Sequence, residues 1–92
     1  MLTNNINYSE LSDVAAFVCV VQTGSFTAAA EQLNTSKSVI SKYITRLEKR
    51  LGVKLLARTT RRLTLTEIGR TLYEGSRQGL EALDNAEEAV SF

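Results

Sequence analysis

Basic residues, whose side chains can bind phosphate oxygens, are concentrated in one stretch of this 92-residue sequence. Residues 34–70 contain ten lysines and arginines against two acids, Glu48 and Glu67, so this block has a formal charge of +8. The flanks are acidic, with −3 over residues 1–33 and −4 over residues 71–92, which leaves a net charge of +1. Such a block indicates a surface that faces a polyanion. A helix with many solvated charges would give the same count, so the residue pattern must decide.

The most informative pattern covers residues 36–51, where apolar and polar side chains separate onto two faces of an expected helix. At about 100° per residue, Ile40, Ile44, Leu47 and Leu51 fall within an arc of about 60° that we expect to be buried. Short serines at the N-terminal end leave room for close approach to a groove, which is typical of a recognition helix in the major groove of DNA. The opposite face bears hydroxyls and bases, namely Ser38, Ser41, Lys42, Thr45, Arg46 and Lys49.

A second basic segment, residues 58–62 (Arg-Thr-Thr-Arg-Arg), lies between the apolar stretches 53–57 and 63–65. Apolar stretches around a polar tip predict a small β-hairpin, although no Asn-Gly or Asp-Gly pair marks its turn. Three arginines on such a loop beside a recognition helix indicate a wing that contacts phosphate or reaches into the minor groove. The alternative is a loop whose arginines are merely solvated.

Helices are expected to position both basic segments, over about residues 9–22, 26–33, 36–51 and 67–90. The second of these is rich in alanine, which lets a neighbouring helix approach closely. The expected N-caps and C-terminal glycines agree with these bounds. The N-caps are Ser9, Ser36 and Thr66, and the glycines are Gly24 and Gly52.

Composition argues against several classes of protein. The chain has no histidine, no cysteine pair, no phosphate-cradling glycine loop and no acidic cluster with metal-ligand spacing, so we expect neither an enzyme nor a metal site. Its single cysteine, Cys19, lies in an apolar run and is expected to be a small buried residue in a cytoplasmic protein. No apolar run approaches the roughly 20 residues that a membrane span needs, and the N-terminus lacks the order of a signal peptide.

The order of these elements, and the residues themselves, resemble the DNA-binding domain of LysR-type transcriptional regulators. Residues 23–69 are similar to that family's signature from end to end, and with Leu11 and Phe17 the resemblance covers about residues 8–90. The hallmarks are Gly24-Ser25-Phe26, Ala29-Ala30, Leu33, Ser41, Ile44, Leu47-Glu48, Leu51-Gly52, Leu55, Arg58, Leu65-Thr66 and Gly69.

The sequence departs from the family's pattern at four positions. Lys37 and Ser38 stand where the family usually has Gln and Pro, and Leu56 and Ile68 replace its usual Phe and Ala. The two apolar changes need only small repacking. Because Lys37 and Ser38 lie where bases are read, their identity bears on which DNA sequence is preferred rather than on whether DNA is bound.

The resemblance implies a mainly α, winged helix-turn-helix domain over residues 1–66, with a three-helix core and a small β-hairpin wing. A long linker and dimerisation helix follows over residues 67–92. The implied function is sequence-specific binding of double-stranded DNA by a bacterial LysR-type regulator. Residues 36–51 would lie in the major groove, and residues 58–62 on the backbone or in the minor groove.

Individual roles follow from the same resemblance. It implies base or groove contacts from Lys37, Ser38, Ser41 and Lys42, to which helical phase adds Thr45 and Arg46. For Ser41 the alternative is a hydroxyl that bonds back to its own helix. The other implied contacts lie near the backbone, at Thr35 and Ser36, and in the wing, at Arg58, Arg61 and Arg62. Lys49 and Arg50 are expected to be ordinary solvated charges.

The last predicted helix carries a heptad-like seam. A helix of about 24 residues is roughly 36 Å long, more than the small core before it can cover. We therefore expect its apolar stripe to need a partner, and the resemblance implies pairing with a two-fold mate. The alternative is that it folds back on its own domain. The seam residues, spaced 4, 3, 4, 3 and 4, are Leu72, Ser76, Gly79, Leu83, Ala86 and Val90.

The resemblance also implies what lies outside these residues. Family members continue into a ligand-binding domain, so a small-molecule effector is expected there, no cofactor is expected within this chain, and the full-length protein could form a higher oligomer. Two other binding functions compete with duplex DNA. A protein-binding module on the same scaffold would not need the +8 block, and the deep, narrow major groove of an RNA duplex excludes a helix.

Overall fold

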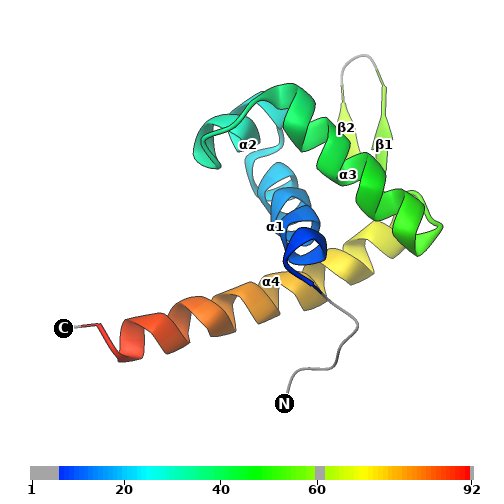
Figure 1. Cartoon of the computed structure of the whole chain (residues 1–92). Coiled ribbons are helices and arrows are strands. Elements are labelled where there is room, and N and C mark those ends of the chain that lie inside the picture. The colour runs from blue at the N-terminus through cyan, green and yellow to red at the C-terminus, as the bar shows by residue number, and fades with distance from the viewer. Residues whose placement is uncertain (1–6, 60–61, 92) are drawn as a thin grey trace.

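A computed structural model describes residues 7–59 and 62–91 (Figure 1). The prediction of a mainly helical, winged helix-turn-helix fold is confirmed. A two-stranded antiparallel sheet pairs Leu56 with Leu65 and Arg58 with Leu63. The elements are α1 (Tyr8–Thr23), α2 (Phe26–Gln32), α3 (Lys37–Leu51), β1 (Leu56–Arg58), β2 (Leu63–Leu65) and α4 (Glu67–Ala89).

Helix α1 begins earlier than predicted, and Ser9 is not its N-cap. Asn7 caps it instead, because its Oδ1 accepts a hydrogen bond from the Glu10 amide at 2.9 Å. The Glu10 carboxylate in turn accepts one from the Asn7 amide at 3.0 Å. This reciprocal capping box satisfies two backbone donors at once, whereas Ser9 lies within the first turn.

The other predicted caps are confirmed. Ser36 accepts from the Val39 amide at 3.2 Å, and Thr66 accepts from the Gly69 amide at 3.0 Å. Gly24 and Gly52 end α1 and α3 in the left-handed conformation, with φ of 72° and 71°. A residue with a Cβ atom is strained in this conformation.

The core lies where α1, α2 and α3 meet above α4. Phe17 and Val20 of α1 are fully buried, as is Ala29 of α2, where the small side chain permits close packing. The predicted buried stripe of α3 is confirmed for Ile40, Ile44 and Leu47.

The prediction is wrong for Leu51, which remains 41% exposed. It is the last residue of α3 and lies at the edge of a groove rather than in the core. Cys19, by contrast, is buried as predicted, and burial raises the pKa of its thiol.

The base of the hairpin is fastened to both neighbouring helices. The Glu48 carboxylate of α3 accepts hydrogen bonds from the amides of Leu55 at 2.8 Å and Leu56 at 3.3 Å. At the start of α4, Thr66 donates its amide to the Leu55 carbonyl at 3.0 Å. A Cβ atom on Gly69 would overlap that same carbonyl oxygen, so only glycine allows α4 to approach this closely. These contacts fix the direction in which the wing leaves the core.

Helix α4 begins beside the hairpin and packs against α1 over its middle turns, and its C-terminal end extends away from the other elements (Figure 1). Leu72, Tyr73 and Leu80 are half-buried against the core, whereas residues 81–90 are exposed. Within the described residues, no single helix is long and apolar enough to cross a membrane. Helices α1 and α2 meet that length and composition only when taken together across a 120° bend.

Candidate nucleic-acid interface

The N-terminal half of α3 presents the predicted polar face to solvent. Lys37, Ser38, Lys42 and Thr45 are exposed, and Ser41 is half-buried at the edge of this face. Among the described residues, the Ser41 hydroxyl has no hydrogen-bond partner, so the alternative in which it bonds back to its own helix is not observed. Short hydroxyl side chains flanked by two lysines can donate to and accept from base edges and phosphates.

The turn before α3 holds this face in place. Asn34 adopts the left-handed conformation, with φ of 57°, and the Thr35 amide donates to the Ala30 carbonyl at 2.8 Å. The Ser36 hydroxyl, besides capping the helix, lies 3.1 Å from the Ser38 hydroxyl. Thr35 and Ser36 remain exposed at the entrance to the helix, where the resemblance predicts backbone contacts.

The wing loop is closed by hydrogen bonds between Thr59 and Arg62. The Thr59 amide donates to the Arg62 carbonyl at 2.9 Å, and the Arg62 amide donates to the Thr59 hydroxyl at 3.0 Å. The Arg62 side chain is exposed. Arg61, the third predicted wing arginine, lies outside the described residues.

Arg58 has a second role that its position in the wing did not indicate. Its guanidinium lies over the Phe26 ring, 4.3 Å from the ring centroid, in a cation–π contact between the hairpin and α2. Arg58 therefore covers a core aromatic ring that is itself only 7% exposed.

The recognition helix and the wing come together on one side of the molecule. Lys37, Arg58, Thr59 and Arg62 line a cavity of about 290 Å³ whose other wall, residues 24–27, is the α1–α2 turn and the start of α2. Basic groups that are 25 positions apart in the sequence, at Lys37 and Arg62, thus face one common space. This convergence gives the surface a positive charge suited to a sugar–phosphate backbone.

Arg46 lies on the outer face as predicted, with a side chain that is 43% exposed, and it is also held by a buried acid of α1. Its Nε donates to both Asp13 carboxylate oxygens, at 3.1 and 2.9 Å, and its Nη2 donates to Oδ1 at 2.7 Å. Asp13 is 1% exposed, and its hydrogen bonds raise the pKa of Arg46 further. The guanidinium also lies 5.2 Å from the centroid of the Tyr43 ring.

Asp13 is not among the site residues predicted from the sequence. A signal was present, because Asp13 shares a helical stripe with Ala16, Phe17 and Val20, at spacings of three, four and seven residues. A carboxylate on a buried stripe requires a cationic partner. The sequence does not say which of the eleven bases that partner is.

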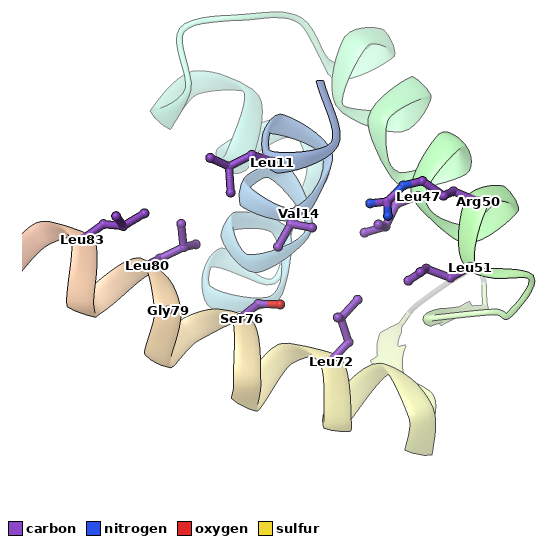
Figure 2. Close-up of a pocket in the computed structure, with 10 residues that line it drawn as sticks. All are labelled: Leu11, Val14, Leu47, Arg50, Leu51, Leu72, Ser76, Gly79, Leu80 and Leu83. Carbon is purple, nitrogen blue, oxygen red and sulfur yellow. The ribbon is translucent and has the colours of Figure 1, made fainter. Parts of the chain in front are cut away.

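The predicted dimerisation seam is divided between two environments. Leu72 and Ser76 are half-buried and line an apolar groove of about 350 Å³ together with Leu11, Val14 and Leu51 of the chain's own domain (Figure 2). The alternative of folding back thus holds for the first turns of the seam. Gly79 and Leu83 also line this groove but are exposed, as are the last two seam residues, Ala86 and Val90.

A metal site is not indicated in the part of the chain that the structure describes, where no group of three or more His, Cys, Asp or Glu side chains could hold an ion.

Comparison with known proteins assigns this architecture to a family. Residues 11–70 match the family described as bacterial regulatory helix-turn-helix protein, lysR family. The chain is 48% identical over 81 residues to the HTH-type transcriptional regulator PtxR of Pseudomonas aeruginosa. The matched residues make up 88% of this chain and 26% of PtxR. The chain is also 47% identical over 80 residues to the HTH-type transcriptional activator AaeR of Escherichia coli K12, covering 87% and 26%. The chain thus spans about a quarter of the length of these relatives.

Solved structures with the same fold include several bound to DNA. The BenM_DBD/catB site 1 DNA complex matches with a TM-score of 0.79 and 33% identity, covering 86% of this chain and 89% of that one. The CbnR_DBD–DNA complex matches with a TM-score of 0.75 and 32% identity, covering 86% and 91%.

Proposed function

Because the chain belongs to the lysR family of bacterial regulatory helix-turn-helix proteins, we propose that it binds specific double-stranded DNA sites as part of a transcriptional regulator. The observation that carries this proposal is the exposed, basic and hydroxyl-bearing N-terminal half of α3 beside the arginines of the wing. The DNA-bound structures of similar domains support it.

The proposed mechanism separates reading from positioning. Helix α3 enters the major groove by its N-terminal end, where Lys37, Ser38, Ser41 and Lys42 reach base edges. Thr45, one turn further along, lies close to the flanking backbone. Thr35 and Ser36 at the helix entrance, together with the wing, contact phosphates and thereby hold the helix in register.

We further propose that two copies assemble through α4. The exposed part of the seam, Gly79, Leu83, Ala86 and Val90, supports this proposal because these residues follow a heptad spacing and remain exposed, although Gly79 and Leu83 also line the apolar groove. Two-fold pairing would present two α3 helices to a partly symmetric site. The function belongs in the cytoplasm, where DNA is accessible in bacteria, and a small-molecule effector would act through residues outside this chain.

Selection from a random pool tests the proposed function directly. The chain is incubated with random duplex DNA in moderate salt, bound molecules are recovered and amplified, and the enriched sequences are determined. We expect a short motif in two inverted half-sites about one helical turn apart. Selection on single-stranded RNA under the same conditions is the control, since an RNA-binding module would enrich that pool instead. No enriched motif in duplex DNA would remove the proposal.

A further inference from the structure

Two ion pairs cross from α1 to α3, one helical turn apart on each helix. Asp13 pairs with Arg46 at 2.7 Å, and Glu10 pairs with Arg50 at 3.8 Å. Arg50 is exposed, as the prediction of an ordinary solvated charge requires, and among the described residues its only ionic contact is this long one. Because α1 and α3 run in opposite directions along these pairs, both Arg46 and Arg50 lie on the side of α3 that faces α1.

The two pairs differ in burial and in geometry. Asp13 is 1% exposed and accepts three hydrogen bonds from Arg46. Glu10 and Arg50 are 23% and 30% exposed, and their closest nitrogen and oxygen atoms lie beyond ordinary hydrogen-bond distance. Only the Asp13 pair has the bidentate geometry that specifies an orientation as well as an attraction.

The remaining contact between these helices is apolar. Ile40, Ile44 and Leu47 of α3 are buried against a core that includes Phe17 and Val20 of α1. Hydrophobic attraction is non-directional, so such an interface tolerates small rotations of one helix against the other. A rotation of α3 about its axis would swing Ser38 and Lys42 across the groove, and base contacts depend on their placement.

We propose that Asp13 is a positioning residue for DNA recognition, which fixes the rotation of α3 by holding Arg46, and that Arg46 does not neutralise a DNA phosphate. The Asp13 carboxylate compensates the guanidinium charge from 2.7 Å away, and Nε and Nη2 are both directed to it. A phosphate approaching Arg46 would meet a nearly neutral pair. This inference rests on the proposed DNA-binding function.

The test compares two double variants that leave the net charge unchanged. Asp13→Asn/Arg46→Gln removes the buried pair without leaving an unpaired charge, and Glu10→Gln/Arg50→Gln removes the looser pair while keeping a side chain that can complete the capping box. For each variant and the parent chain, affinities for the selected DNA site and for an unrelated duplex are measured across a series of salt concentrations. Circular dichroism and thermal melting establish the folded fraction at the assay temperature.

We expect Asp13→Asn/Arg46→Gln to lower the ratio of specific to non-specific affinity by about tenfold, roughly the discrimination of one base contact, with an unchanged salt slope. The control double variant should change that ratio less than about twofold. If the folded variant kept the ratio of specific to non-specific affinity, the Asp13–Arg46 pair would have only a structural role and the proposal would be wrong. A salt slope shallower by about one would show that Arg46 contacts a phosphate. A parent chain without site preference would instead remove the underlying function.

Arg46→Lys keeps the test decisive if the double variant does not fold. Lysine retains the charge opposite Asp13 but cannot form the bidentate contact. We expect the same loss of discrimination at an unchanged salt slope. Full discrimination with lysine at this position would contradict the proposal, because a point charge would then be sufficient.

Discussion

Individual basic side chains of this domain perform different tasks, although the sequence presents them as one block. Arg46 is paired with Asp13, and Arg58 is stacked on Phe26, so both serve to hold elements together. Lys42 and Arg62 are exposed and have no structural partner of this kind among the described residues. The cations available to DNA are thus fewer than the charge count of the block suggests.

Lys42 and Arg62 should differ in how their loss affects binding. Lys42→Ala is expected to lower preference for the selected site, because Lys42 lies on the reading face of α3. Arg62→Ala is expected to weaken specific and non-specific binding equally, through a lost phosphate contact. Competition assays against unrelated duplex measure both effects. If the wing variant changed base preference and the helix variant did not, the two roles would be reversed.

Arg58 should contribute to stability more than a wing residue ordinarily does. We expect Arg58→Ala to lower the free energy of unfolding by about 1 kcal/mol, because it removes a cation–π contact and uncovers Phe26. Arg62→Ala, a matched removal of an arginine in the same hairpin, should leave the melting temperature almost unchanged. Chemical denaturation of both variants checks the difference, and equal stabilities would show that the stacking is without energetic weight.

At the scale of the helices and strands, features that depend on residues close in the sequence, such as helix caps, were easier to predict than contacts between elements. Ser36 and Thr66 begin their helices, and Gly24 and Gly52 end theirs, through hydrogen bonds to residues three or four positions away, so their role is visible in the sequence. The capping box of Asn7 and Glu10 carries an equally local signal, which competed with a second plausible cap at Ser9.

Contacts between elements could not be predicted in the same way. The pairing of Asp13 with Arg46 spans 33 positions, and the stacking of Arg58 on Phe26 joins two separate elements. Helical phase placed Arg46 on the polar face correctly, but phase does not show that a neighbouring helix brings a carboxylate to that edge. Leu51 has the right phase for burial and lies beyond the part of α3 that the core covers.

The stripe of α3 provides a test at the scale of the element. Ile44 is 2% exposed within the core, and we expect Ile44→Ala to destabilise the domain by about 2–5 kcal/mol, enough to unfold much of so small a protein. Leu51→Ala removes a similar volume from a position that is 41% exposed and should cost clearly less. Melting curves followed by circular dichroism measure both, and a nearly unchanged melt for Ile44→Ala would contradict the observed packing.

At the scale of the whole molecule, the acidic and basic segments are separated in space as well as along the sequence. The acids of α4 lie on a helix that extends away from the hairpin, and Arg77 bridges two of them, Glu74 at 3.2 Å and Glu81 at 2.8 Å. The interface side, with Lys37 and the wing, keeps the positive charge. Phosphate would be attracted to one side of the molecule and repelled from the other, which orients the domain before contact.

This polarity predicts a strong dependence of DNA binding on salt. If a pair of protomers neutralises about six phosphates, the logarithm of the affinity should fall against the logarithm of salt concentration with a slope near −5. Fluorescence anisotropy with a labelled duplex between about 50 and 200 mM salt measures the slope. A slope between 0 and −1 would be incompatible with binding through this surface.

The proposed pairing of two copies depends on the C-terminal half of α4. Leu83 is 54% exposed, and it lies at the end of the groove that Leu72 and Ser76 share with α1 and α3 (Figure 2). The first turns of the seam are already used within the chain, which leaves a short exposed stripe for a second copy. The small residues Gly79 and Ala86 would allow the two helices to approach closely. A dimer built on so short a stripe should be weak.

Leu83→Glu therefore tests whether α4 pairs two copies. We expect sedimentation equilibrium of the parent chain, from micromolar to near-millimolar concentration, to show a shift from monomer to dimer. Leu83→Glu should abolish that shift, because association would bury a carboxylate without a partner. Gln78→Glu is the matched control, since it adds the same charge at another exposed position of α4 and should leave association almost unchanged. A parent chain that stayed monomeric over the whole range, with no response to either variant, would leave pairing through α4 without support.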